Sequence, residues 1–412
     1  MPAGTGCISR ASADGRGRGA SPDIASPDGV PERRQLAYRS PLGAPPLTDQ
    51  EMHALQTRFA ELLGRNLDAS ERSTLPTLDA PLARKLLARL DAVPLFAHAY
   101  THLMNFTHGT FRPVDLLDFA YRHELSGVCI HLADGEERSL GRANDATLQA
   151  VAAHARRLGL AVHLEISSTD REEVDHAIHV ARVMGVRHLR VYSRYEGLLS
   201  AVMAHVSEDL RYLAAQADLH DLHIHFEQHE ELKSAEIAAL LTEIGHPRLW
   251  ALFDCGNMIN AAEQPLDALR TLAPWIRQAH LKGVHILPEG PGNGHRGVLQ
   301  GSAEDDLPVP RMLFELLMLG EDEPQVIALA LEQENYYYAP MFRHHAEPAD
   351  PFIPYREMSE TALPPGMSMQ DMLEGEPRWA NNQVRVVRSI LQELRWLAEC
   401  SLLSAGKAAA TP

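Results

Sequence analysis

Short apolar runs alternate with amphipathic segments along most of this chain. Eight runs have the length and residue types of buried strands, and they lie at 95–101, 127–132, 160–166, 188–193, 222–228, 249–257, 276–285 and 325–335. Helical patterns at 145–158, 170–184, 235–244 and 308–319 are each followed by a glycine, the residue that most readily adopts the positive φ of a helix C-terminus. Strand and helix units repeated in this way predict an α/β fold, specifically a (β/α)8 TIM barrel of parallel strands.

A doubly wound sheet is the main alternative architecture. That fold would place a glycine-rich loop after the first strand, but the sequence there reads HLMNFTHG. The glycine-rich stretch 290–301 follows the seventh strand, and we interpret it as a loop, with ligand contact as the alternative. The barrel is therefore the favoured fold.

The segments outside the barrel have their own patterns. Residues 1–47 are rich in Gly, Ser, Arg and Pro and lack the apolar segment of a secretory signal, which predicts a disordered leader. Residues 48–92 predict a helical extension with helices at 48–66 and 81–92. We expect the barrel to span 93–400 and a disordered tail to span 401–412.

Strand side chains alternate between two faces, and in this chain the two faces differ sharply. In the fifth strand Leu222, Ile224 and Phe226 would face the helices, which leaves His225 and Glu227 inside. The inward polar residues predicted in this way are His131, His163, Glu165, Arg190, His225, Glu227, Asp254, His280, Lys282, Glu332 and Glu334. Most lie at the C-terminal ends of strands, where the active sites of this fold are built.

So many buried ionisable groups require pairing or a metal ion. Glu227, Asp254, His280 and Glu332 fall on four consecutive strands and have the residue types of a coordination sphere. Three carboxylates with one imidazole form an oxygen-rich set, which suits Mn²⁺, Mg²⁺ or Co²⁺, with Zn²⁺ as a further option. We therefore expect one divalent metal ion as cofactor.

Four motifs carry a family resemblance: HFEQH at 225–229, FDCGN at 253–257, HLKG at 280–283 and LEQEN at 331–335. In this order they resemble the xylose isomerase-like TIM barrel superfamily, also called sugar phosphate isomerases/epimerases. The resemblance implies that Glu227, Asp254, His280 and Glu332 hold one metal, and that a closing helix lies at 381–398. Two departures stand out: Gly283 replaces the usual Asp after HLK, and the segment 336–379 is longer than usual.

The resemblance implies an isomerase or epimerase that acts on a small carbohydrate through an enediolate. Glu227 and Glu332 would form the acid/base pair, and Lys282 would hold an oxyanion. Substrate contacts are expected from His131, His163, Glu165, Arg190, His229, Asn257 and Glu334, for which a satisfied polar network inside the barrel is the plain alternative. The choice of Glu332 over Glu334 as ligand rests on the position in the family motif.

Three other functions remain as alternatives. A lyase, either a decarboxylase or a dehydratase of a 3-oxo sugar acid, would use Lys282 and Arg190 to hold the substrate carboxylate. A DNA-repair endonuclease of the same superfamily needs further histidines, but Asn257 stands where one is required. A sugar-binding or scaffold protein would not need the acid/base carboxylates.

The charge and composition of the chain limit which partners and which cellular location can be expected. A formal net charge of −17 disfavours nucleic acid as a partner. The four cysteines form no C-x-x-C pair, and no apolar run is long enough to cross a membrane, so we expect a cytoplasmic protein. The aromatic-rich segment 336–379 favours either a lid over the site or an interface arm that forms a homo-oligomer.

Overall fold

The computed structural model describes residues 38, 40–43, 45–355 and 363–408, and its centre is a closed barrel of eight parallel strands. The strands are β1 (Leu95–His98), β2 (Gly127–His131), β3 (Ala161–Glu165), β4 (His188–Val191), β6 (His223–Glu227), β7 (Leu249–Asp254), β8 (Ile276–Leu281) and β11 (Ala328–Leu331). Each lies inside one of the eight expected runs, and β1 closes the barrel by pairing with β11. The predicted fold class is confirmed.

Helices cover the outer face of the barrel, and the strands pack their apolar side chains against them. These helices are α5 (Pro113–Arg122), α6 (Asp145–Leu158), α7 (Arg171–Met184), α8 (Leu199–His220), α9 (Ser234–Ile244), α10 (Pro265–Leu272) and α11 (Val309–Met318). Helices α6 and α7 end at Gly159 and Gly185, with φ of 69° and 72°. Leu164, Ile224 and Phe253 are fully buried in the core, as their strand positions predict.

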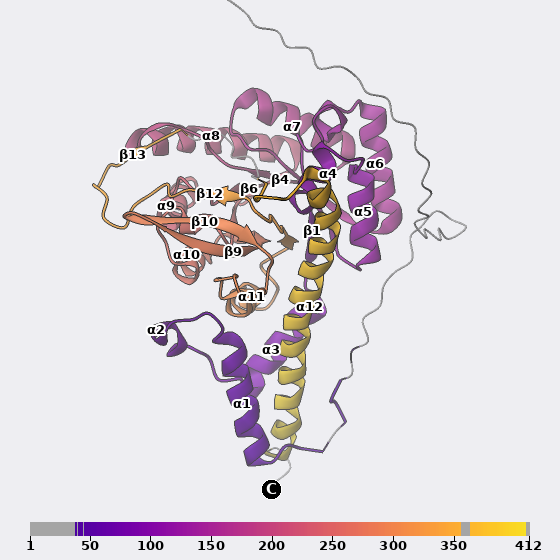
Figure 1. The fold of residues 1–412 in the computed structure, drawn as a ribbon, viewed down its shortest axis with the longest axis vertical. Coiled ribbons are helices and arrows are strands. Elements are labelled where there is room, and N and C mark those ends of the chain that lie inside the picture. Colours follow the sequence, from indigo (N-terminus) through magenta and orange to yellow (C-terminus); the bar gives the residue numbers. More distant parts are fainter. Residues whose placement is uncertain (1–37, 39, 44, 356–362, 409–412) are drawn as a thin grey trace, which may run out of the picture.

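A second helical layer lies beside the barrel (Figure 1). It consists of α1 (Asp49–Leu63), α2 (Ala69–Arg72), α3 (Ala80–Asp91) and the long α12 (Met369–Ala408). Phe59, Leu86 and Leu394 are buried in the core that these helices share with the barrel. Helix α12 begins well before the expected residue 381 and continues to Ala408, so residues 401–408 are helical rather than a disordered tail. Most of the expected leader lies outside the described residues.

The stretch expected as a loop after the seventh strand is instead a β-hairpin. Strand β9 (Gly283–Glu289) pairs with β10 (Gly292–Val298), and β12 (Tyr338–Ala339) adds a third antiparallel strand. A Cβ on Gly283 would lie 2.5 Å from the Gln300 nitrogen, and one on Gly297 would lie 1.7 Å from the Glu334 oxygen. The hairpin therefore needs glycine at both positions, which explains why the family's usual Asp is absent at Gly283.

The segment between β11 and α12 packs mainly on the outside of the barrel. Strand β13 (Phe352–Ile353) pairs with β5 (Gly197–Leu198) next to α8. Of this segment, Glu332, Glu334 and Tyr337 line the cavity at the barrel mouth, as does Met369, the first residue of α12. Residues 356–362 lie outside the described residues, and the role as a lid or an interface arm stays a prediction.

Arg343 attaches this segment to α9 through an ion-pair cluster. Its side chain is 2% exposed, donates to both oxygens of Glu236 at 2.9 Å, and contacts Glu347 at 2.7 Å. Arg343→Ala is expected to lower the free energy of unfolding by about 3 kcal/mol, because two carboxylates lose their buried partner. Arg112→Ala removes an exposed pair with Asp115 and should cost about 0.5 kcal/mol in the same urea titration. Equal losses in the two variants would contradict this account.

Candidate active site

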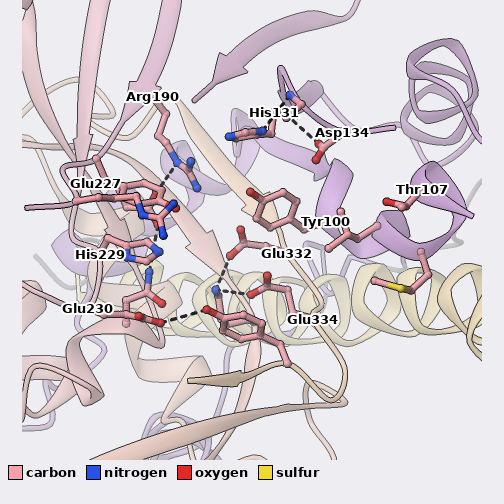
Figure 2. Close-up of a pocket in the computed structure, with 18 of the residues that line it drawn as sticks. Tyr100, Thr107, His131, Asp134, Arg190, Glu227, His229, Glu230, Glu332 and Glu334 are labelled. Carbon is pink, nitrogen blue, oxygen red and sulfur yellow. Dashed lines mark hydrogen bonds and ion pairs between the residues drawn. The ribbon is translucent and has the colours of Figure 1, made fainter. Parts of the chain in front are cut away.

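A cavity of about 550 Å³ opens at the C-terminal end of the barrel strands (Figure 2). Side chains from the ends of β2, β4, β6, β8 and β11 project into it, as expected for an active site of this fold. Eight of the residues predicted from the sequence line this cavity: His131, Arg190, Glu227, His229, Asn257, Lys282, Glu332 and Glu334.

Three of the four expected metal ligands lie around one nitrogen of the fourth, His280. Glu227 and Glu332 line the cavity, whereas Asp254 and His280 are not among its lining residues. His280 Nδ1 lies 3.9 Å from Glu227 Oε1, 3.7 Å from Asp254 Oδ2 and 3.3 Å from Glu332 Oε1. With metal–oxygen bonds of about 2.1 Å, the atoms around an octahedral ion lie roughly 3.0 Å apart when adjacent and roughly 4.2 Å when opposite. The three separations from His280 fall within this range. Among the described residues, Glu227, Asp254 and His280 have ligand atoms that all lie within 4.8 Å of one another, and so do His98, Glu165 and His280, whereas Glu332 belongs to neither group.

Each of these four residues also has an atom without a well-oriented hydrogen bond. The atoms are Glu227 Oε2, Asp254 Oδ2, His280 Nδ1 and Glu332 Oε2, all buried. The other oxygen of Asp254 accepts the backbone N–H groups of Gly256 at 2.7 Å and Asn257 at 3.0 Å, which directs Oδ2 toward the cluster. Three of these atoms face a cation: Glu227 Oε2 contacts Arg190, and Asp254 Oδ2 and Glu332 Oε2 contact Lys282 Nζ. Three carboxylates and one imidazole are the residue types that hold a divalent ion such as Mn²⁺ or Mg²⁺.

Two cationic side chains contact the same carboxylates. Lys282 Nζ lies 2.9 Å from Asp254, 2.6 Å from Glu332 and 2.8 Å from Glu334, and the Arg190 guanidinium contacts Glu227. Burial alone would lower the pKa of Lys282, but the three carboxylates outweigh it and raise that pKa well above its usual value. Lys282 is therefore an ammonium group that can bind an oxyanion, not a base.

Glu165 lies behind His280 rather than in the cavity wall. One oxygen accepts from His280 Nε2 at 3.2 Å and the other from His98 Nε2 at 2.9 Å, and both Glu165 and His98 are fully buried. A carboxylate on the second nitrogen fixes the tautomer and ring orientation of a metal-binding histidine. Glu165 thus positions His280, whereas the sequence suggested a substrate contact. His98 was missed, although it occupies an inward position of the first strand.

Glu165→Gln is expected to weaken Mn²⁺ binding by roughly 10- to 100-fold, because the amide holds the His280 ring less firmly. Titration calorimetry on the metal-free protein measures this directly. Glu376→Gln is the matched control, since Glu376 is a buried carboxylate that bonds Met104 and Asn105 of α4 (Leu103–Thr107). If the Glu165→Gln variant binds Mn²⁺ with unchanged affinity, Glu165 does not position His280.

The deeper histidines fill the barrel interior. His163 packs against Phe96 and His188 with ring centroids 4.7 and 4.5 Å away, and His225 bonds His188 at 3.0 Å. Burial lowers the pKa of His163 to about 3 and that of His225 well below its usual value, so both are neutral. The structure thus places His163 below the cavity and not in its wall.

The remaining expected contacts lie around the mouth. Asn257 donates to Glu227 at 3.2 Å, and His229 stacks on Tyr192 at 3.8 Å. Burial, with the nearby Arg190, lowers the pKa of His131 to about 3. Sequence reasoning missed Tyr100, Asp134 and Tyr337, which also line the cavity. These residues follow strand ends, where no periodic pattern identifies them.

The sequence of this chain matches the model of a known family. The model of the xylose isomerase-like TIM barrel matches residues 123–333. The chain belongs to this family. The xylose isomerase-like assignment made from the four sequence motifs is thereby confirmed.

A curated relative extends the similarity beyond that range. An uncharacterized protein of Escherichia coli K12, YihM, is 43% identical over 313 residues, which cover 76% of this chain and 95% of YihM. None of the helices in the described part of this chain is long and apolar enough to span a bilayer.

Solved structures similar to this chain include a xylose isomerase domain protein and a sugar epimerase. A xylose isomerase domain protein from Planctomyces limnophilus is 18% identical, with a TM-score of 0.45, and the match covers 59% of this chain and 91% of that one. A D-psicose 3-epimerase is 12% identical, with a TM-score of 0.49, and the match covers 73% of this chain and all of the epimerase.

Proposed function

We propose that this protein is a divalent-metal-dependent isomerase or epimerase of a small carbohydrate. The observation that supports it most is the convergence of Glu227, Asp254 and Glu332 on His280 Nδ1, next to a cavity large enough for a monosaccharide. Membership of the xylose isomerase-like family agrees with this chemistry.

The residues have separable roles. A divalent ion held by Glu227, Asp254, His280 and Glu332 would polarise neighbouring substrate oxygens and stabilise an enediolate. Glu227 and Glu332, on strands separated by β7 and β8 in the barrel, would remove a proton from the carbon next to a carbonyl and return one. Lys282 would hold the developing oxyanion, and Asn257 orients Glu227.

The lyase alternative requires Lys282 and Arg190 to hold a substrate carboxylate. Both side chains already contact carboxylates of the protein, Lys282 with three partners and Arg190 with Glu227 and Glu165. The same pairing of Lys282 applies to the isomerase, so the lyase stays the second candidate and the reaction itself must decide between them.

One metal ion per chain is the expected stoichiometry, because the ligand-type atoms converge on a single point. Protein loaded with Mn²⁺ and desalted should contain close to one metal per chain by elemental analysis. A value near three would instead support a multi-metal site, and no metal after loading would contradict the proposed centre.

The reaction type is tested with the metal-loaded protein in D₂O. Incubation with a panel of ketoses and 3-oxo sugar acids should give deuterium incorporation next to a carbonyl without release of CO₂. Release of CO₂ from an acid would support the lyase, and neither signal from any carbohydrate would refute the proposed function.

A further inference from the structure

The wall of the cavity carries far more negative than positive groups. Seven carboxylates line it, from Asp134, Glu136, Glu227, Glu230, Glu231, Glu332 and Glu334, against three cations, Arg190, Arg194 and Lys282. A bound divalent ion would halve the formal excess of negative charge but would not remove it. The outer part of the wall, away from the expected metal ligands, contains four of these carboxylates: Asp134, Glu136, Glu230 and Glu231.

The cations on the wall are already engaged. Arg190 contacts Glu227 and lies 3.7 Å from Glu165, and Lys282 contacts Asp254, Glu332 and Glu334 within 2.9 Å. Arg194 lies near the mouth, with its guanidinium over the Tyr355 ring at 5.4 Å. Phosphate and carboxylate groups are normally held by Arg or Lys forks or by backbone N–H groups. Arg190 and Lys282 neutralise the protein's own carboxylates instead.

We infer that the substrate of the function proposed above is an uncharged polyhydroxy carbohydrate, and neither a phosphate ester nor a sugar acid. Hydroxyl groups donate hydrogen bonds, and the carboxylates of Glu230, Glu231 and Glu334 are acceptors. A phosphate dianion has only acceptors at its charged oxygens, so it would meet repulsion and lose its hydration without compensation. The structure thus matches the donor pattern of a free sugar.

Figure 2 shows how this wall is arranged. Glu227, His229 and Glu230 lie on one side of the cavity and His131 and Asp134 on another, with Glu332 and Glu334 between them. Tyr337 donates its hydroxyl to Glu230 at 3.2 Å, which holds that carboxylate at the mouth. A sugar anchored at the bottom of the cavity would extend its far hydroxyls between these acidic walls.

The test compares D-fructose with D-fructose 6-phosphate, and D-ribulose with D-ribulose 5-phosphate, on the Mn²⁺-loaded protein at pH 8. Binding is measured by saturation-transfer NMR, and turnover by deuterium incorporation in D₂O. We expect the free ketoses to bind, and kcat/KM for each phosphate ester to be lower by roughly a hundredfold.

The two readouts separate the inference from the proposed function. Binding of free ketoses over phosphate esters supports the inference even if no deuterium is incorporated, a result that would refute only the proposed chemistry. Tighter binding or faster exchange of either phosphate ester overturns the inference while leaving the isomerase or epimerase in place. Binding of neither class, or preferred binding of a sugar acid, also overturns it.

A charge change in the wall adds a second test. Glu136 lines the cavity and Glu137, its exposed neighbour in the same turn, does not. Glu136→Lys should raise the ratio of kcat/KM for the phosphate ester over the free ketose by roughly fivefold, because it adds two charge units of the favourable sign. Glu137→Lys should leave this ratio within about twofold. Equal ratios in the two variants would contradict an electrostatic selection by this wall.

Discussion

Asp254→Asn is expected to bind no divalent metal and to show no measurable turnover, while the barrel stays folded. Asp254 Oδ1 accepts the N–H groups of Gly256 and Asn257, and an asparagine oxygen can keep both bonds. The amide NH₂ would then point at His280 in place of Oδ2, and a neutral nitrogen donor group is a poor metal ligand. The substitution therefore removes one ligand with almost no change in shape.

Loss of the carboxylate also changes the charge balance. Burial alone would raise the pKa of Asp254, but Lys282 and His280 outweigh it and hold that pKa well below its usual range. In the variant Lys282 keeps Glu332 and Glu334 as partners, so we expect cooperative unfolding to persist.

Metal content, turnover and circular dichroism are measured together for this variant. Asp305→Asn is the matched control, because Asp305 is a buried carboxylate that accepts backbone N–H groups from Val284 and Gly301 outside the cluster. It should retain one Mn²⁺ per chain. Normal metal content and activity in Asp254→Asn would show that the coordination sphere is assigned incorrectly.

Glu332→Gln is expected to lower kcat by roughly 10³- to 10⁴-fold, because it removes both a ligand and one member of the acid/base pair. Glu334→Gln is the matched control, two residues away on the same face and lining the same cavity. The structure distinguishes them: Glu332 Oε1 lies 3.3 Å from His280 Nδ1, whereas Glu334 reaches Lys282 at 2.8 Å. The control should lose about tenfold or less.

Deuterium exchange and Mn²⁺ content are measured on both variants. If Glu334→Gln loses most of the deuterium exchange and Glu332→Gln keeps it nearly normal, then Glu334, and not Glu332, is the catalytic carboxylate. If both variants lose only a small and equal part of the exchange rate, Glu332 does not take part in proton transfer.

The barrel could be predicted from the sequence because its signals are local and repeated. Apolar and polar side chains alternate along the strands, as in Ile224, His225, Phe226 and Glu227, so the face that packs against the helices can be read from the sequence. The hairpin at β9 and β10 could not be predicted in this way. Gly283 is required by the close approach of the Gln300 backbone, and Gly297 by that of Glu334. Both partners are distant along the chain, so no local sequence pattern shows these contacts.

The candidate site, too, could be predicted only in part from the sequence. Strand parity predicted that Glu227, Asp254, His280 and Glu332 point inward. In the structure Glu227, Asp254 and His280 have ligand atoms within 4.8 Å of one another, and Glu332 Oε1 lies 3.3 Å from His280 Nδ1. Parity says only that a side chain points inward, not at which depth. For that reason Glu165 and His163 were expected in the cavity wall, whereas one lies behind His280 and the other lies below.

The close approach of Gly297 to Glu334 has a consequence for redesign of this protein. Gly297 N–H donates to the Tyr337 carbonyl at 2.8 Å and its oxygen accepts from Tyr336 N–H at 2.9 Å, so the β9–β10 hairpin is fixed to the chain that follows β11. Exchanging this hairpin for a shorter turn would move Glu332 and Glu334 together with it. Changes of substrate preference are therefore better sought on the opposite rim, in the turn from Ala133 to Glu136, where side chains reach the cavity without supporting β11.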